Sequence, residues 1–187
     1  MRLATGIPVP KFSIADLDGA PVTPETFAGQ KLWLILARFV ACPFCSVRLR
    51  DVIKRHDTLT SFGVQVFVVF PSAEHRVRQF ARKYAPPFRV AADPRQTIFQ
   101  LFGSETSWLG NLRTLVRVPR VISAVATTRM NPLDSDDVPH RMPSEFLVTP
   151  AGMIDEAFYA EMMDDGLAIS RVVQWARRLD AEREERA

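Results

Sequence analysis

The sequence predicts an α/β protein whose parallel sheet has helices on both sides. Three apolar runs of strand length are each followed by a segment with helical spacing, and this alternation favours crossover connections between parallel strands. The run at 64–70, VQVFVVF, is almost continuously apolar, as expected of a central strand that is covered on both faces. A hairpin and a closing helix after residue 143 add antiparallel strands, so the complete sheet is expected to be mixed.

The N-terminal part is expected to hold a short strand and a helical turn. The run 12–17 has strand character, and Asp18-Gly19 predicts a turn between it and Val22. The segment 23–27 begins with a threonine that can cap a helix and a proline suited to the first helical position. We therefore expect a brief helical turn before the first long strand.

Three strand–helix units follow. Ser72 is expected to cap the second helix, and Gly63 and Gly103 are expected to end the first and the third. The third helix is expected to bury Leu101 together with Ile98 and Phe102. In the three predicted units, a strand at 32–39 is followed by a helix at 43–61, a strand at 64–70 by a helix at 73–84, and a strand at 88–92 by a helix at 94–102.

The segment 104–141 interrupts this alternation. Its first half places Trp108, Leu112 and Leu115 on one helical face, and its second half is polar and bounded by prolines. Three interpretations compete for the amphipathic half: packing on the domain, a dimer interface or active-site cover, and binding at a membrane surface. We treat 104–141 as an insertion within a single domain that spans residues 1–187.

The C-terminal part predicts a hairpin and a helix. The segment 144–149, SEFLVT, is a strand by its residues, and Pro150-Ala151-Gly152 is a turn into a returning strand at 153–160. A helix is expected over 167–183, with Val172 and Trp175 among its buried residues.

The only two cysteines of the chain are three residues apart in the motif Cys42-Pro43-Phe44-Cys45. They follow an apolar strand and begin a helix, where unpaired N–H groups and the helix dipole favour a thiolate. Arg38, Arg48 and Arg50 add positive charge nearby. Cys42 is expected to be the exposed, reactive sulfur, with Cys45 one turn further inward as its partner. The alternative is a pair of inert core thiols.

Composition excludes several classes of function. The net charge of +3 is too small to argue for nucleic acid as a partner, and no run of 18 apolar residues suggests a membrane span. The N-terminus shows no secretory signal, so a reducing, cytoplasmic compartment is expected. The histidines show no ligand pair at zinc-finger spacing, and we predict no metal and no cofactor.

Several segments together resemble the thioredoxin fold, and within it the peroxiredoxin-like branch, the alkyl hydroperoxide reductase and thiol-specific antioxidant (AhpC/TSA) group. They are PKFSIADLDGAPVTPETFAG, FVACPFC, AADPRQTIFQLFG and MPSEFLVTPAGMI. The resemblance implies a thioredoxin-like α/β fold in which Met142-Pro143 is a cis peptide beside the thiols. It also implies an arginine near the last strands that holds the thiolate and a peroxide, and Arg141 is the nearest candidate. A solvated loop arginine is the alternative.

The chain departs from the usual peroxiredoxin pattern Pro-x-x-x-Thr/Ser-x-x-Cys. With Cys45 as the peroxidatic residue, Cys42 stands where the hydroxyl residue belongs and Arg38 stands where the proline belongs. The hydroxyl that orients a peroxide is therefore absent, and this argues against ordinary peroxidase action.

Three hypotheses follow. The leading one is a thiol-disulfide oxidoreductase in which Cys42 attacks and Cys45 resolves, with Pro43 stiffening the turn and Phe44 contacting a partner. The second is a peroxidase that acts through Cys45, by alignment, or Cys42, by exposure. The third is a non-catalytic or metal-carrying protein with Cys42, Cys45 and His140 as ligands. The expected partners are a disulfide or hydroperoxide substrate and a thiol electron donor, and a homodimer is a further possibility.

Overall fold

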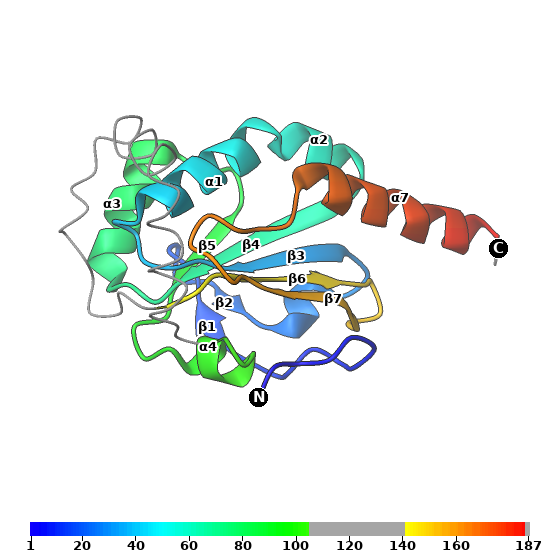
Figure 1. The fold of residues 1–187 in the computed structure, drawn as a ribbon, viewed down its shortest axis with the longest axis horizontal. Helices are drawn as coiled ribbons and strands as arrows, with labels where there is room; N and C mark the ends of the chain where they lie inside the picture. Colours follow the sequence, from blue (N-terminus) through cyan, green and yellow to red (C-terminus); the bar gives the residue numbers. More distant parts are fainter. Residues whose placement is uncertain (105–140, 186–187) are drawn as a thin grey trace.

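The computed structural model describes residues 1–104 and 141–185, and it contains a five-stranded sheet with helices on both faces (Figure 1). The strand order is β5-β4-β3-β6-β7. β3, β4 and β5 are parallel, whereas β6 and β7 run antiparallel to their neighbours, so the predicted mixed sheet is confirmed. The bounds are Lys31–Leu36 for β3, Val64–Phe70 for β4, Arg89–Ala92 for β5, Ser144–Val148 for β6 and Ile154–Tyr159 for β7.

A small antiparallel sheet precedes the main one. β1 (Ile14–Ala15) pairs with β2 (Pro21–Val22). Between them the Asp16 carboxylate accepts the backbone N–H groups of Asp18 and Ala20, at 3.0 and 2.9 Å. Gly19 has a φ of +83°, a conformation that glycine adopts without a steric penalty. The predicted turn at Asp18-Gly19 is therefore confirmed.

The helices form two layers around the main sheet. In Figure 1, α1, α2 and α7 lie on one side of the sheet, and α4 lies on the other with β1 and β2. The described helices are the 3₁₀ turn η1 (Pro24–Phe27), α1 (Pro43–Lys54), α2 (His56–Ser61), α3 (Glu74–Tyr84), α4 (Thr97–Leu101) and α7 (Ile169–Glu184).

Each face of the sheet carries its own apolar core, because successive side chains of a strand point to opposite faces. In β3, Trp33 and Ile35 pack with Val52, Val77 and Trp175 on the side of α1, α3 and α7. The intervening residues Leu32, Leu34 and Leu36 pack with Phe67, Phe99 and Phe146 on the side of α4. Burial on both faces explains why β3 and β4 are apolar at almost every position.

Three helix predictions need correction. The helix predicted over 43–61 is broken at Arg55 into α1 and α2, and this break leaves both Val52 and Leu59 fully buried. Ala73, not Ser72, precedes the first residue of α3, because the Ser72 hydroxyl accepts the backbone N–H of Val40 instead.

The third correction concerns α4, which is shorter than the predicted 94–102. The carboxylate of Asp93 accepts the N–H groups of Thr97 and Ile98 and so holds the start of this helix. Leu101, which was predicted to be buried, is 39% exposed, because Phe99 takes the inward position instead.

The predicted amphipathic helix around Trp108, with Leu112 and Leu115, lies outside the described residues. The two ends of the 104–141 insertion are described, and they meet: Arg141 Nη1 donates to the Ser104 carbonyl at 2.6 Å. The single-domain organisation over residues 1–187 stays a prediction. No helix among the described residues is long and apolar enough to cross a bilayer.

Candidate redox site

The cysteine motif lies where β3 passes into α1. Cys42 is the residue before the first turn of α1, with φ −71° and ψ 116°, and Pro43 takes the first helical position as predicted. The connection from β3 is held by backbone bonds from Ala37 N–H to the Val69 carbonyl at 2.9 Å and from Val40 N–H to the Ser72 hydroxyl at 3.0 Å. Both thiols are free, and they stand at the N-terminus of a twelve-residue helix.

Cys42 carries the thiolate of the pair. Burial by itself raises the pKa of Cys42, but a hydrogen bond from the Cys45 thiol and the charge of Arg38 oppose it. The backbone N–H groups of Cys45 and Phe44 act in the same direction, and together these groups lower the pKa of Cys42 from 9.0 to about 6. At neutral pH Cys42 is therefore ionised, which is the state required of a sulfur nucleophile.

Cys45 keeps its proton. Its hydrogen bond to Cys42 and its burial raise the pKa of Cys45 well above the ordinary value, and the nearby Arg38 offsets only part of this rise. The two sulfurs lie close enough to share a hydrogen bond, with Cys45 as donor and Cys42 as acceptor. A nucleophile requires the ionised state and a resolving thiol does not, and the assignment of these two roles to Cys42 and Cys45 stays a prediction.

The expected exposure of the pair is wrong. Cys42 is only 1% exposed and Cys45 is 7% exposed, so the first sulfur is the more deeply buried one. The reason is that the Cys42 side chain turns inward, toward Arg38 and the N–H groups of α1, which stabilise its charge.

Arg38 supplies the positive charge at the thiolate. Its side chain is 2% exposed, its Nη1 lies 3.5 Å from Cys42 Sγ, and its Nε donates to the carbonyl oxygen of Arg141 at 2.7 Å. Of the three predicted cations, Arg38 is the one that lies against the Cys42 sulfur and lowers the pKa of Cys42 by its charge.

Arg141 does not take the role that the resemblance implied. Its side chain donates to the Ser104 carbonyl and to the Gln96 side chain, and it stacks over the Phe99 ring, with 5.2 Å between the guanidinium carbon and the ring centroid. Arg141 is 6% exposed, so the alternative of a solvated loop arginine is also wrong. Its link to the thiolate runs through its backbone carbonyl, which holds Arg38.

Met142 and Pro143 lie beside the site, but the peptide bond between them is trans. The described residues contain no cis peptide bond, which corrects the expectation taken from the resemblance. The backbone of this segment is already paired within the chain: the Met142 carbonyl accepts the Ser104 hydroxyl at 3.3 Å, and the Pro143 carbonyl accepts the Ala160 N–H at 3.1 Å. These two carbonyl groups are therefore engaged within the protein.

A small cavity adjoins Cys45. Its volume is about 30 Å³, which is room for about one water molecule, and Phe44 and Pro143 line it together with Cys45. Phe44 is half-buried against the cluster formed by Phe39, Ala41 and the two cysteines. The full lining consists of Ile35, Ala37, Phe44, Cys45, Arg48, Leu49, Pro143, Glu145, Met163, Asp164 and Asp165.

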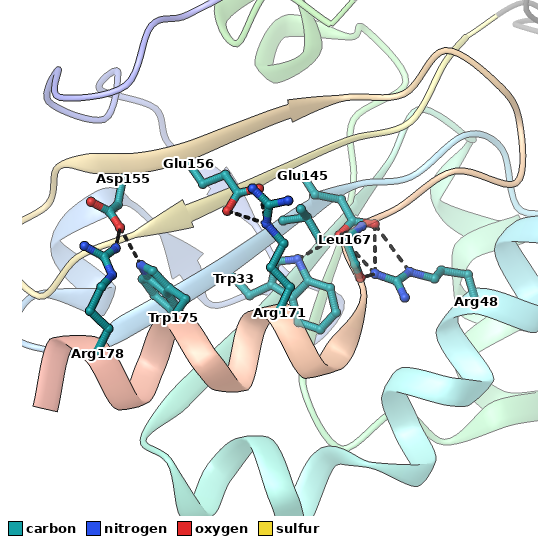
Figure 2. A network of polar contacts seen from close by, with 9 residues as sticks. All are labelled: Trp33, Arg48, Glu145, Asp155, Glu156, Leu167, Arg171, Trp175 and Arg178. Atoms are coloured by element: carbon teal, nitrogen blue, oxygen red, sulfur yellow. Dashed lines mark hydrogen bonds and ion pairs between the residues drawn. The ribbon is translucent and has the colours of Figure 1, made fainter. Parts of the chain in front are cut away.

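Sequence reasoning missed Glu145, the buried carboxylate at this cavity. Its carboxylate accepts hydrogen bonds from Trp33 Nε1 at 3.0 Å, from Arg48 Nη2 at 3.1 Å and from the Leu167 N–H at 3.2 Å. Figure 2 shows how these residues surround it. Glu145 is 2% exposed, and burial raises its pKa, although Arg48 and the other donors oppose the rise. The available signal was a charged residue at an inward position of the apolar run SEFLV.

The metal-carrying hypothesis receives no support from the geometry. Within 1–104 and 141–185, no three histidine, cysteine, aspartate or glutamate side chains gather in a way that could hold an ion. His140, the third ligand of that hypothesis, lies outside the described residues.

These observations define a class: a thioredoxin-fold protein with a thiolate at the start of its first long helix. The sequence profile of the AhpC/TSA family matches residues 5–157, and the chain belongs to this family. Membership supports a thiol-dependent redox activity. No curated protein matches the sequence.

Solved structures agree on the fold. Peroxidoxin BcpB from Mycobacterium tuberculosis superposes with a TM-score of 0.70 at 13% identity, over 95% of this chain and 98% of that one. A peroxiredoxin-like protein from Aquifex aeolicus superposes with a TM-score of 0.69 at 13% identity, over 96% of this chain and 89% of that one. A protein described as thiol:disulfide interchange protein DsbE, from Chlorobium tepidum, superposes with a TM-score of 0.65 at 17% identity, over 93% of this chain and 98% of that one.

Proposed function

We propose that this protein is a thiol-disulfide oxidoreductase in which Cys42 is the nucleophile and Cys45 the resolving thiol. The observation that carries the proposal is the placement of two free thiols, three residues apart, at the start of α1, with Arg38 Nη1 3.5 Å from Cys42 Sγ. The lowered pKa of Cys42 and the raised pKa of Cys45 agree with an attacking and a resolving thiol. An attacking sulfur must be ionised at working pH, whereas a resolving sulfur is needed only after the first bond has formed.

The reaction has two exchange steps. The Cys42 thiolate attacks one sulfur of a substrate disulfide, so the substrate S–S bond breaks, a mixed disulfide forms and the first substrate thiolate leaves. Cys45 then loses its proton and attacks Cys42 Sγ, which releases the second substrate thiolate and leaves a Cys42–Cys45 disulfide. The substrate gains two electrons, and a thiol electron donor must return two electrons to the protein. Phe44 and Pro143, at the wall of the Cys45 cavity, are proposed to contact the substrate.

A peroxidase is the second candidate, and the family assignment favours keeping it. Here the Cys42 thiolate attacks a hydroperoxide, becomes a sulfenic acid and releases an alcohol or water, and Cys45 condenses with the sulfenic acid to give a disulfide and water. The ionisation of the pair favours Cys42 over Cys45 as the attacking sulfur in this version too. Arg38 is proposed to hold the peroxide beside the thiolate.

One pair of measurements separates the two reactions. The reduced protein is mixed in a stopped-flow instrument with hydrogen peroxide, and separately with a small disulfide such as oxidised glutathione. The proposal expects rapid thiol loss with the disulfide, and thiol loss with peroxide no faster than that of free cysteine. Fast loss with peroxide alone overturns the proposal and establishes the peroxidase. The cytoplasmic location and the homodimer remain predictions.

The direction of electron flow depends on the reduction potential of the Cys42–Cys45 pair. A value near −270 mV identifies a reductant, and one around −120 mV an oxidant. The lowered pKa of Cys42 stabilises the reduced form and so favours the oxidising end of this range. Equilibration with glutathione redox buffers measures it directly.

A further inference from the structure

A cavity of about 290 Å³ lies at the opposite end of β3 from the thiols. Leu32, near the start of β3, lines this cavity, whereas the cysteine motif follows Leu36 at the end of the same strand. The strand between these two residues spans about 13 Å. The cavity is therefore separate from the redox site, and the proposed function does not use it.

The floor of this cavity is apolar and belongs to the core on the α4 side of the sheet. Val9, Phe27, Leu32 and Val148 form it, and each of them is 9% exposed or less. The remaining apolar lining consists of Pro24, Ala28, Pro150, Ala151 and Gly152. The volume equals that of about ten waters in the liquid, so it suits a ligand of about ten non-hydrogen atoms. Apolar walls of this kind bind the hydrocarbon part of a small ligand.

Backbone hydrogen bonds hold the segments around the cavity together. Val9 N–H donates to the Gly152 carbonyl at 2.9 Å, and Gly29 N–H donates to the Pro150 carbonyl at 3.0 Å. These bonds tie the N-terminal segment and the residues after η1 to the turn between β6 and β7. Because the walls are already held in place, a ligand does not have to order them when it binds.

Two opposite charges, Lys11 and Glu25, stand at the exposed mouth of the cavity. The Thr23 hydroxyl and the Glu25 backbone N–H lower the pKa of Glu25 by hydrogen bonding, and the charge of Lys11 acts in the same direction. Lys11 is thus near enough to act on the carboxylate, yet among the described residues neither side chain takes part in an ion pair. An ammonium and a carboxylate that share one opening, with a gap between them, complement a ligand that carries both charges.

The neighbouring groove suits such a ligand less well. It has a volume of about 780 Å³ and lies beyond the turn at 149–151, which both spaces share. Each acidic residue of this groove is already engaged within the chain. The pairs are Asp155 with Arg178, Glu182 with Arg178, and Asp180 with Lys31. Its carboxylates are therefore neutralised, whereas the charges at the mouth of the smaller cavity are available.

We propose that this cavity binds a free α-amino acid with an apolar side chain, such as phenylalanine or leucine. The ligand carboxylate lies at the Lys11 ammonium, and the ligand ammonium lies at the Glu25 carboxylate. The ligand side chain enters the cavity and packs on Phe27, Leu32 and Val148. Burial of this side chain is the main source of affinity, and the two exposed charge pairs mainly select the class of ligand. This inference goes beyond the proposed function and does not depend on it.

The test compares three ligands that share one aromatic ring. Phenylalanine carries both charges, phenylpropionate carries only the carboxylate, and phenylethylamine carries only the ammonium. Each is titrated into the reduced full-length protein, and the methyl NMR signals of Val9, Leu32 and Val148 on the cavity floor are followed. Phenylalanine is expected to bind saturably and about fivefold more tightly than either analogue, which is the usual contribution of one exposed charge pair.

Variants at the mouth connect each ligand charge with its side chain. Lys11→Met is expected to weaken phenylalanine binding about fivefold and to leave phenylethylamine binding unchanged, because that ligand has no carboxylate to lose. Glu25→Gln is expected to weaken phenylalanine binding by about the same factor and to leave phenylpropionate binding unchanged. Lys54→Met and Glu184→Gln remove exposed charges of the same types that do not line the cavity, and these control variants should change no affinity.

Ala28→Phe tests the position of the site. Ala28 is exposed and lines the cavity, so a larger side chain there can fill the space without disturbing the core. All three ligands should then fail to bind, while the urea unfolding curve stays unchanged. Failure of phenylalanine to shift the three methyl signals in the wild-type protein, or undiminished binding to a folded Ala28→Phe variant, overturns the site. Phenylalanine binding no tighter than that of either analogue overturns the assigned class of ligand.

Discussion

The Arg38 guanidinium lies 3.5 Å from the Cys42 sulfur and is held there by the carbonyl oxygen of Arg141, 103 residues further along the chain. Both side chains at the short contact are almost fully buried. In such surroundings a charge pair is screened little by water, so a single arginine has a large effect on the thiolate. The insertion that ends at Arg141 is thereby connected to the chemistry at Cys42.

Replacing Arg38 by methionine is expected to raise the pKa of Cys42 from about 6 toward its ordinary range. The thiolate fraction at neutral pH then falls, and the first exchange step slows by about tenfold or more. The ultraviolet absorbance of the thiolate, followed during a pH titration, measures the pKa. Arg50→Met, which removes a partly exposed arginine further along α1, is the control, and an equal shift in that variant would remove Arg38 from its assigned role.

The reduced protein is expected to gain stability as the pH rises from about 6 to 9. The folded pKa of Cys42 is depressed below the unfolded value of 9.0, so its contribution is present above 9.0 and is lost as the pH falls through about 6. Between these values the slope is about 1 kcal/mol per pH unit. Above pH 9 the raised pKa of Cys45 acts in the opposite direction, and stability falls again.

Urea unfolding of the reduced protein across this pH range measures the effect. The variant Cys42→Ser lacks the ionising group and provides the reference curve. Parallel curves for the two proteins between pH 6 and 9 contradict the lowered pKa of Cys42.

Alkylation should separate the ionisation of Cys42 from its accessibility. The rate with iodoacetamide is expected to rise through a midpoint at about pH 6, because the thiolate reacts. Its plateau is expected to lie about tenfold or more below that of an exposed thiolate of the same pKa, because Cys42 is 1% exposed. Low urea concentrations, below the unfolding transition, should increase the plateau. A plateau equal to that of free glutathione thiolate would show that the sulfur is open to solvent.

Gly166 is expected to be essential for packing over the Glu145–Arg48 ion pair. A β-carbon at this position would lie 2.6 Å from Glu145 Oε1 and 2.9 Å from Arg48 Nε, closer than side-chain contacts allow. Gly166→Ala should therefore cost about 1–3 kcal/mol of unfolding free energy. Because the glutamate causes the clash, the double variant with Glu145→Ala should be more stable than additivity predicts, by about 1 kcal/mol. Additive effects in urea unfolding would refute this explanation.

Ser72 is expected to stabilise the segment that leads into the cysteine motif. Its hydroxyl accepts the N–H of Val40 at 3.0 Å, and both residues are buried. Ser72→Ala leaves this N–H without that partner and should cost about 1–3 kcal/mol. Ser61→Ala, at an exposed serine that donates to the Thr58 carbonyl, is the control and should change stability by less than about 0.5 kcal/mol. Equal losses in the two variants would argue against a specific role for Ser72.

Several features could be predicted because the interactions that cause them are local. A proline after Cys42 and helical spacing beyond it identified the start of α1, and apolar runs identified β3 and β4. The same local reasoning failed at Leu101 and at Ser72. There a neighbouring residue or a distant backbone N–H took the position or the bond that the pattern had assigned.

The inward turn of Cys42 could not be predicted, since it depends on where Arg38 points. That direction is set by a carbonyl contributed from the far end of the insertion. Likewise, the sequence alone does not show that Glu145 is buried in an ion pair. Its contacts with Trp33 and Arg48 form only because β6 pairs with β3. Pattern alone does not specify such contacts across long separations in the chain.

The sequence by itself determined that two thiols stand at the beginning of a helix, in an α/β fold with a mixed sheet, because capping and strand patterns depend on neighbours within a few residues. Only the tertiary structure decided which sulfur holds the charge, how deeply it is buried and which carboxylate lies beside its partner. These properties depend on burial and on charges brought together from β3, β6 and the end of the insertion, and such effects act through space and not along the chain.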